Sequence, residues 1–330
     1  MLIDAEIESS SSFAKSETAN KNETKQTRSR QIMRMQSFIR AHDLNLSDGE
    51  KSLVAVDGNE SSGTIMNALL VVGLNEATDE SDRWIATSGT DKIISKRAKQ
   101  SKKGDSVDEG PMGSWKNAAA GSEVFVWSSK CTRPGHGSDY PVVKSRGLIP
   151  ASAEEVVDLL KDSSRVKTYN KYSSGREDQH VFTQHGNSSV HCVEKCPQLG
   201  VSGVAKIMSS KSQPPLTRKP LEFKTLFYAR RLDGEDDVEF DGVAYITVGR
   251  SVWETCEGTT DGSDNSTTRC EILLSVNLVR EVVTANGERW CELTCITHAV
   301  SPGVPMFVGK KLGLVAAENY IKDIREVFEK

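Results

Sequence analysis

We predict an α+β domain in which helices gather on one side of a long antiparallel sheet. Three observations lead to this prediction. Strand-like segments follow one another from about Glu123 to Val300, short turns separate the later ones, and a long helix closes the chain. Strands joined this tightly must pair antiparallel, because a parallel crossover needs a dozen or more residues. Helices segregated to one side of such a sheet are typical of α+β folds.

The composition limits the class of protein. The 330 residues suffice for one large domain or two ordinary ones, and the net charge of −4 gives no bulk basic character that would indicate nucleic acid. The first twenty residues lack the basic start and apolar core of a secretory signal. No apolar run reaches the roughly 18 residues of a membrane span. Seven scattered cysteines favour reduced thiols, so we expect a cytoplasmic protein with peripheral contact at membranes.

The N-terminal segment 1–60 is predicted to be a mostly disordered tail, because its polar, serine-rich start cannot bury enough apolar surface. Within it, a short basic amphipathic helix is expected near 28–42. This helix has two interpretations: a segment that packs on the domain or stays a disordered basic tail, or a segment that touches anionic lipid or recruits a protein partner. The folded domain is expected to span 61–330.

Helices and short strands are expected before the sheet proper. Ser61 or Ser62 begins a helix that reaches Glu76, and short strands are expected at 84–87 and 91–96. A flexible insertion near 97–121 follows, because that stretch is polar and aperiodic. Ser152 caps a second helix, whose first turn holds Glu154 and Glu155 where the helix dipole favours acids. A short helix near 165–171 completes this region.

The strands are predicted from β-branched and aromatic residues between turn signals. The Asn286-Gly287 pair is a strong hairpin signal between the last two strands. The predicted strands are 123–129, 140–149, 180–185, 189–196, 222–232, 243–254, 269–283 and 289–300.

The strand faces mix polar and apolar residues where a dry core would be uniform. Glu194, Asn277 and Thr297 share faces with apolar neighbours, and a core does not accept such groups without partners. Either these faces contact solvent, or they line a cavity that holds an amphipathic guest. Because the pattern recurs on several strands, we keep the cavity as a hypothesis.

The terminal helix, 303–330, raises the same question. Gly309, Gly313, Ala316 and Ala317 fall on one side with Tyr320, Ile324 and Val327, so that side is small in the first half and bulky in the second. The first half is apolar nearly all round, which predicts cover on more than one side. The small residues permit either a close approach of helix to sheet or space for a ligand.

No catalytic or metal-binding pattern is visible. The pairs Cys192/Cys196 and Cys291/Cys295 are four residues apart on predicted strands, so they are interpreted as small core residues and not as a zinc site. His180, His185 and His191 lie close in sequence but show no carboxylate-histidine-nucleophile arrangement, and each is expected at a strand end or a turn. We expect no catalytic residue, no metal and no cofactor.

Several motifs, taken in order, resemble a known family, the START domain (steroidogenic acute regulatory protein-related lipid transfer). They are clearest from about Val124 to the C-terminus and include Trp84 near the start; the main ones are "VKSRGLIPASAEEVVDLL", "EFKTLFYARRLD", "AYITVGRSV", "TTRCEILLSVNLV" and "CELTCITHAVSPGVPMFVGKKLGLVAAENYIKDIREV".

The resemblance implies a helix-grip fold, in which a curved antiparallel sheet wraps a long C-terminal helix around a tunnel for one lipid. Family members bind sterols, phospholipids or sphingolipids, and they carry them between membranes or sense them. The implied partners are a lipid ligand and, transiently, a membrane surface. The residues expected to bind lipid are Glu194, Thr225, Phe227, Tyr245, Asn277, Leu293, Thr297, Gly309, Leu312, Gly313, Ala316 and Ala317.

The sequence departs from the family pattern at three places. Leu221 and Glu222 stand where members often have Arg-Asp, Phe227 stands where some have an inward arginine, and Tyr169 replaces a tryptophan. No head-group preference therefore carries over. The long segment 197–220 is the candidate gate.

Opening at a membrane is expected to expose apolar side chains on the terminal helix and on the candidate gate. These are Phe307, Val308, Leu312 and Val315 on the helix, with Val201, Val204, Ile207 and Met208 on the gate.

Two other functions stay open at this stage. An enzyme on the same fold would need an inward acid-base pair, such as Glu194 with His298. A signalling adaptor would sense lipid in the domain and recruit a partner through the N-terminal tail.

Overall fold

The computed structural model describes ten stretches of the chain, all within a compact unit that runs from Ala41 to Lys330. The predicted tail, most of the predicted insertion and Glu194 lie outside them. The described stretches are 62–101, 123–131, 140–182, 190–191, 202–215, 217–232, 242–252, 266–284, 287–302 and 304–329.

Helices dominate the start of the described chain and strands the rest, before a last helix. In chain order the elements are α3 (Ser62–Thr78), β1 (Ile85–Ala86), α4 (Ser88–Ser101), β2 (Val124–Lys130), β3 (Pro141–Ile149), α5 (Ala153–Lys161), the 3-10 turn η3 (Ser163–Arg165), α6 (Val166–Tyr169), β4 (Ser173–Val181), β5 (Val204–Ser212), β6 (Leu221–Leu232), β7 (Ala244–Ser251), β8 (Thr268–Arg269), β9 (Glu271–Val283), β10 (Arg289–Val300) and α7 (Met306–Phe328).

The described strands form one sheet in the order β1-β2-β3-β10-β9-β7-β6-β5-β4. All these neighbours pair antiparallel, and β8 adds a two-residue parallel contact to β6. Because β10 lies between β3 and β9, the last strand joins the early strands to the later ones. The predicted α+β class with an antiparallel sheet is confirmed.

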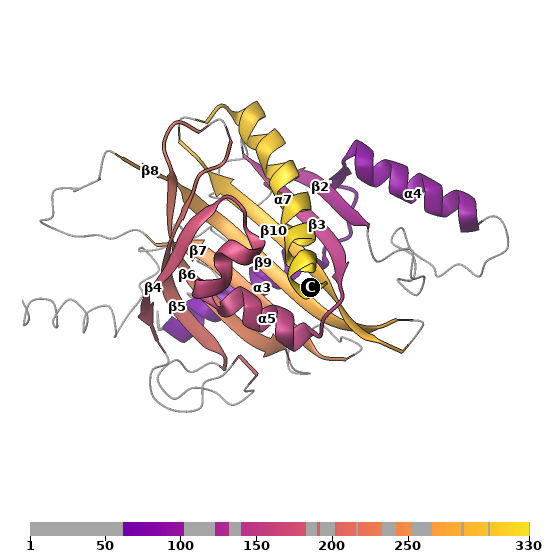
Figure 1. Cartoon of the computed structure of the whole chain (residues 1–330), viewed down its shortest axis with the longest axis horizontal. Coiled ribbons are helices and arrows are strands. Elements are labelled where there is room, and N and C mark those ends of the chain that lie inside the picture. The colour runs from indigo at the N-terminus through magenta and orange to yellow at the C-terminus, as the bar shows by residue number, and fades with distance from the viewer. Residues whose placement is uncertain are drawn as a thin grey trace, which may run out of the picture. The chain divides into compact units, whose positions relative to one another are not determined.

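Helices cover both faces of the sheet, not one as predicted. Figure 1 shows α5 and α7 in front of the sheet and α3 behind it. On the rear side α3 comes so close that a Cβ on Gly73 would lie 2.7 Å from Val248 Cγ1. The reason is that the middle of β9 presents apolar side chains on its rear face, Leu274, Val276 and Leu278, which must be removed from water. The front and rear faces are called the inner and outer face below.

The strand register defines which residues share the inner face. On β10 these are Cys291, Leu293, Cys295 and Thr297. Two rows of paired residues cross this face. The first is Ser145, Cys295, Asn277, Thr247 and Ala229, and the second is Val143, Thr297, Ser275, Gly249 and Phe227. The faces that the sequence predicts to be mixed are thus the inner faces of the strands, and α5 and α7 lie over them.

Local signals explain the predicted helix and hairpin that the structure contains. Ser152 Oγ accepts a hydrogen bond from Glu155 N, and Glu155 accepts one from Ser152 N, which completes the capping box of α5. Between β9 and β10, Gly287 has a φ of +79°, a left-handed conformation that glycine adopts without steric cost. Helix α5 therefore begins at the predicted cap, and the β9–β10 hairpin turns at the predicted glycine.

One predicted strand, 91–96, is wrong, because these residues lie within α4. Thr87 Oγ1 accepts a hydrogen bond from Thr90 N and so caps the helix. Thr90 and Arg97 contact β2 from one side of α4, as helical spacing requires. The start of the predicted insertion near 97–121 is therefore helical up to Ser101.

The segment between β4 and β6 also differs from the prediction. Val204–Ser212, part of the predicted gate 197–220, is strand β5, and Ile207 and Met208 are buried in it. The prediction that these two side chains contact a bilayer is therefore wrong. Of the strand predicted at 180–185, His180 and Val181 lie in β4, which begins at Ser173, and 183–185 lie outside the described residues. Val190 and His191 lie in a turn, and the rest of the predicted strand 189–196 is outside the described residues.

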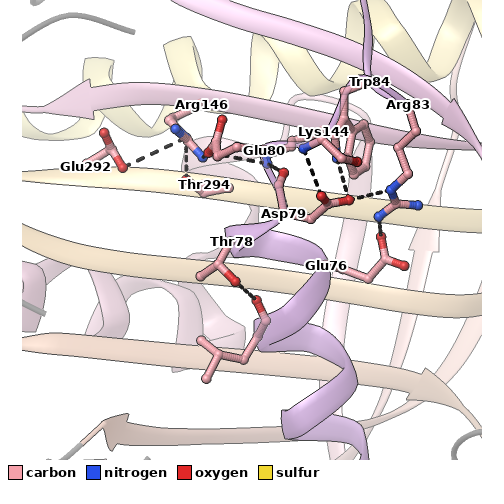
Figure 2. A network of polar contacts seen from close by, with 12 residues as sticks. Glu76, Thr78, Asp79, Glu80, Arg83, Trp84, Lys144, Arg146, Glu292 and Thr294 are labelled. Carbon is pink, nitrogen blue, oxygen red and sulfur yellow. Dashed lines mark hydrogen bonds and ion pairs between the residues drawn. The ribbon is translucent and has the colours of Figure 1, made fainter. Parts of the chain in front are cut away.

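A polar network ties the end of α3 to the outer face (Figure 2). Lys144 Nζ donates to Asp79 O at 2.7 Å, and Arg146 Nη2 donates to Glu80 Oε1 at 2.5 Å. Arg83 pairs with Glu76 and Asp79, and its guanidinium lies over the Trp84 ring. The connection between α3 and β1 is thus fixed by charged groups that would cost much to bury alone.

Two pKa values in this network are strongly displaced. Burial opposes the charge of Asp79, but hydrogen bonds from Ser81 and Arg83 hold the pKa of its carboxyl at about 2. Burial, with Arg146 nearby, lowers the pKa of the Lys144 ammonium to about 8. Lys144 is only 2% exposed, so it contributes a pH dependence to folding.

We predict that the free energy of unfolding rises between pH 8 and pH 10.5 because of Lys144. In that window the unfolded lysine still holds its proton while the folded one has lost it, so raising the pH removes a penalty of roughly 3 kcal/mol. Denaturant titrations across this pH range, on the native chain and on Lys144→Met, measure the effect. The difference between the two curves should vary with pH only in this window; parallel curves would contradict the assignment.

Candidate functional site

The second half of α7 holds the helix on the sheet. All fully buried residues of α7 lie there: Ile321, Asp323, Ile324 and Arg325. A Cβ on Gly147 of β3 would lie 2.7 Å from Ile321 Cγ2, so the missing side chain makes room for the isoleucine. Arg325 Nε donates to Leu148 O at 3.0 Å. This half is anchored by both packing and hydrogen bonding.

The first half of α7 is not packed in this way. None of its residues is fully buried, and Met306 and Phe307 are 55% and 76% exposed. The prediction that this half is covered on more than one side is therefore wrong, because the described chain provides no element on its outward side. The apolar side chains there remain in contact with solvent.

The glycines of this half do not serve a close approach of helix to sheet. A Cβ on Gly309 would meet only Val304 Cγ1, at 3.8 Å, and a Cβ on Gly313 only Val143 Cγ2, at 3.6 Å. These are ordinary van der Waals distances, unlike the 2.7 Å at Gly147. Of the two explanations left open by the sequence, close packing does not fit these distances.

One side of α7 changes character along its length. Tyr320 stacks edge-on against Tyr169 of α6, with ring centroids 5.9 Å apart, and burial raises the pKa of Tyr320 well above its usual value. Gly309 and Ala316 lie on the same side, at helical spacing from Tyr320. Ala316 is exposed. The side on which Tyr320 packs against Tyr169 in the second half therefore carries small residues in the first half.

The inner face opposite this region carries accessible polar groups. Thr297 is exposed although β10 is paired on both sides, with Val143 and with Ser275. Asn277 Nδ2 donates to Thr247 Oγ1 at 2.8 Å. Thr225 is 6% exposed, and its hydroxyl has no hydrogen-bond partner in the protein. Such a buried hydroxyl costs free energy unless something else binds it.

The structure places the residues expected to bind lipid in two groups. The strand residues Thr225, Phe227, Tyr245, Asn277, Leu293 and Thr297 all lie on the inner face, and Gly309, Leu312, Gly313, Ala316 and Ala317 lie in α7.

Not all of these residues lie beside the first half of α7. Leu293 and Tyr245 belong to the core cluster that also contains Val156 and Val157 of α5. Tyr245 also bonds His191 through its hydroxyl, at 3.0 Å. The part of the inner face beside the first half of α7 is the one with Thr297 and Asn277.

The inner face also holds a buried lysine, Lys206, that the sequence analysis does not predict. Lys206 Nζ donates to Lys161 O at 2.6 Å and to Asp178 Oδ2 at 2.9 Å. Burial lowers the pKa of Lys206, while the bond to Asp178 acts against this. Lys206 closes the C-terminal end of α5 and is neutralised there. Alternation in "VAKIMSSKS" is the signal for this strand, which the prediction of a gate loop at 197–220 leaves out.

Of the acid-base pair considered for the enzyme alternative, Glu194 lies outside the described residues, and only His298 can be placed. His298 is fully buried and pairs in register with Leu274, on the outer face that α3 covers. It therefore cannot act with an inward group. Cys291 and Cys295 are buried thiols of the inner face, and burial raises the pKa of both, which makes them poor nucleophiles.

The described residues also bear on metal sites and on membrane-spanning helices. No group of three or more potential metal ligands comes together in them. None of their helices combines the length and the apolar character needed to cross a bilayer.

Comparisons with known proteins find similarity at the level of structure only. Neither a scan of protein-family models nor a search of curated proteins finds a match. Solved structures that resemble the chain include StAR-related lipid transfer domains, the family that the sequence motifs indicate.

Three of these structures illustrate the range of the similarity. The human StarD13 (DLC2) lipid transfer and protein localization domain is 12% identical, with a TM-score of 0.45, and the alignment covers 72% of this chain and 95% of that one. Human StAR-related lipid transfer protein 5 is 10% identical, with a TM-score of 0.46, covering 72% and 96%. A StAR-related lipid transfer protein fragment from Xanthomonas axonopodis is 12% identical, with a TM-score of 0.43, covering 68% and 98%. At these values the similarity says nothing of function.

We predict that Thr225→Val stabilises the ligand-free protein by about 1 kcal/mol, because it removes a buried hydroxyl without a partner. Denaturant unfolding measures the change. Thr247→Val is the matched control, since it removes the acceptor of the Asn277 amide and should cost about 1 kcal/mol. If both variants were destabilised equally, the Thr225 hydroxyl would have a partner within the protein.

Proposed function

We propose that this chain binds one hydrophobic lipid between the first half of α7 and the inner face, for transfer between membranes or lipid sensing. Two observations support the proposal. A Cβ on Gly309 or Gly313 would meet nothing closer than 3.6 Å among the described residues, and Thr297 is exposed on a central strand. A region of this kind, apolar with a few polar groups, suits an amphipathic ligand.

The energetic requirement explains why such a protein needs an enclosed apolar site. Burial of one methylene contributes about 0.8 kcal/mol, so a sixteen-carbon chain resists leaving a bilayer by roughly a dozen kcal/mol. A carrier must offer the chain an apolar environment of similar quality. Phe227 and Leu312 contribute apolar surface from the sheet and from α7, and residues 304–317 supply most of the cover.

The polar groups favour a lipid with an uncharged polar head. Across β10, β9 and β7, the two inner rows carry Cys295, Asn277 and Thr247, and Thr297, Ser275 and Gly249, none of which is charged at neutral pH. Hydroxyl and amide groups hydrogen-bond to a hydroxyl or carbonyl oxygen. Lys206 on the same face is already neutralised by Asp178. A sterol or a sphingolipid with a neutral head fits these groups better than an anionic phospholipid.

The first half of α7 is the proposed gate. It has no fully buried residue, whereas the second half is fixed against β3, so the helix has a stable anchor beside a weakly held segment. Exposed Met306, Phe307 and Val315 would contact acyl chains when this segment moves at a membrane. The adaptor role of the N-terminal tail stays a separate proposal, since that segment lies outside the described residues.

We predict that Gly313→Leu lowers lipid loading while the protein stays folded. The leucine side chain would extend past Val143 into the proposed site, whereas loss of a helix glycine stabilises by up to about 1 kcal/mol. Native mass spectrometry of the full chain purified from cells counts co-purifying lipid, and circular dichroism reports folding.

Gly313→Ala is the matched control, because its single added carbon fits at 3.6 Å from Val143. It should load lipid like the native chain. A native chain that carries no lipid under any purification condition, or a Gly313→Leu variant that loads normally, would contradict the proposed site.

A further inference from the structure

Helix α4 is fixed at the edge of the sheet by one side only. Thr90 is 1% exposed, and its hydroxyl donates to Val126 O at 3.0 Å and accepts from Val126 N at 2.7 Å. Seven residues later, Arg97 bonds Glu123 at 2.8 Å and lies over the Phe125 ring, 5.0 Å from its centroid. These contacts hold α4 against β2 in a defined orientation.

The opposite side of α4 carries a row of lysines. Lys92, Lys96 and Lys99 follow one another at intervals of four and three residues, which places them within about 60° on the helix. All three are exposed. In the part of the chain that the structure describes, no carboxylate pairs with them, whereas Arg97 on the β2 side is paired. The outward side of α4 is therefore a cationic surface on a chain with a net charge of −4.

Exposed apolar residues lie at the same end of the sheet. Ile85, three residues before α4 begins, is 68% exposed and pairs with Ser128 of β2. Ser128 pairs in turn with Val143, the residue that a Cβ on Gly313 of α7 would meet. Figure 1 shows β2 between α4 and α7, and both helices contact that strand. Lysines beside exposed apolar residues are typical of surfaces that bind the membrane interface.

We propose that the outward side of α4 binds anionic lipid head groups and directs the first half of α7 to anionic membranes. This inference rests on the proposed function, since it places the proposed gate at the bilayer. The lysines act only within about 8 Å at physiological ionic strength, so α4 must itself touch the surface. An extended anionic plane meets α4 and the exposed residues of α7 together.

The test compares the full native chain with Lys92→Gln, Lys96→Gln and Lys99→Gln combined. Glutamine keeps a similar helix propensity, so folding should be unchanged. Co-sedimentation is measured with vesicles of phosphatidylcholine alone and of phosphatidylcholine with one third phosphatidylserine. The native chain should prefer the anionic vesicles, and the triple variant should bind them about a hundredfold more weakly. Binding to neutral vesicles should not change.

A control variant loses the same charge elsewhere. Arg165→Gln, Lys167→Gln and Arg289→Gln remove three exposed cations that do not lie on α4, and this variant should bind anionic vesicles nearly as the native chain does. The segment near 28–42 is intact in all three proteins, so its own lipid binding cannot produce a difference between them.

Two outcomes would overturn the inference. One is equal loss in both triple variants, which would mean that only overall charge matters. The other is undiminished binding of the α4 variant to anionic vesicles. Co-purifying lipid, counted in the same α4 variant, reports on the proposed function independently: lipid present without α4-dependent vesicle binding defeats this inference alone.

Discussion

The fit of Ile321 against Gly147 is the contact on which the arrangement of α7 depends. Any side chain at position 147 would meet Ile321 Cγ2 at 2.7 Å, so the helix could not lie this close to β3. Arg325 adds a hydrogen bond to Leu148 O, and Lys171 binds Asp323 from beside α6. Because the buried residues of α7 are concentrated in its second half, the first half is held less tightly, through partly buried side chains such as Leu314 and Ala317.

The region around the proposed lipid site has features that cost stability. Two glycines in the first half each lose about 1 kcal/mol of helix stability relative to alanine, and the Thr225 hydroxyl is buried without a protein partner. Apolar residues of the same half stay exposed to water. Departures from local stability rules concentrate at functional sites in natural proteins. Two of the three departures here, the glycines and the exposed apolar residues, occur in the first half of α7, which is why we propose the ligand site beside it.

The sequence predicted the parts of the fold that depend on local signals. The α5 capping box, the hairpin at Gly287 and the inner faces of β6, β9 and β10 follow from short-range patterns. Helix α4 was missed because its contacts, such as Thr90 with Val126, join residues 36 positions apart. Strand β5 was missed because its inward Lys206 is neutralised by Asp178, 28 positions away. The role of Gly147 could not be foreseen, since a strand glycine gives only a weak indication of a close approach.

The central claim is that the two halves of α7 have different roles, one as anchor and one as cover for a lipid. Amide hydrogen exchange along the helix, with and without bound lipid, tests this claim most directly. We expect the amides of 320–328 to exchange slowly in both states, and those of 306–317 to become protected only when lipid is bound. Equal protection of both halves without lipid would contradict the account, and so would a lipid effect confined to the second half.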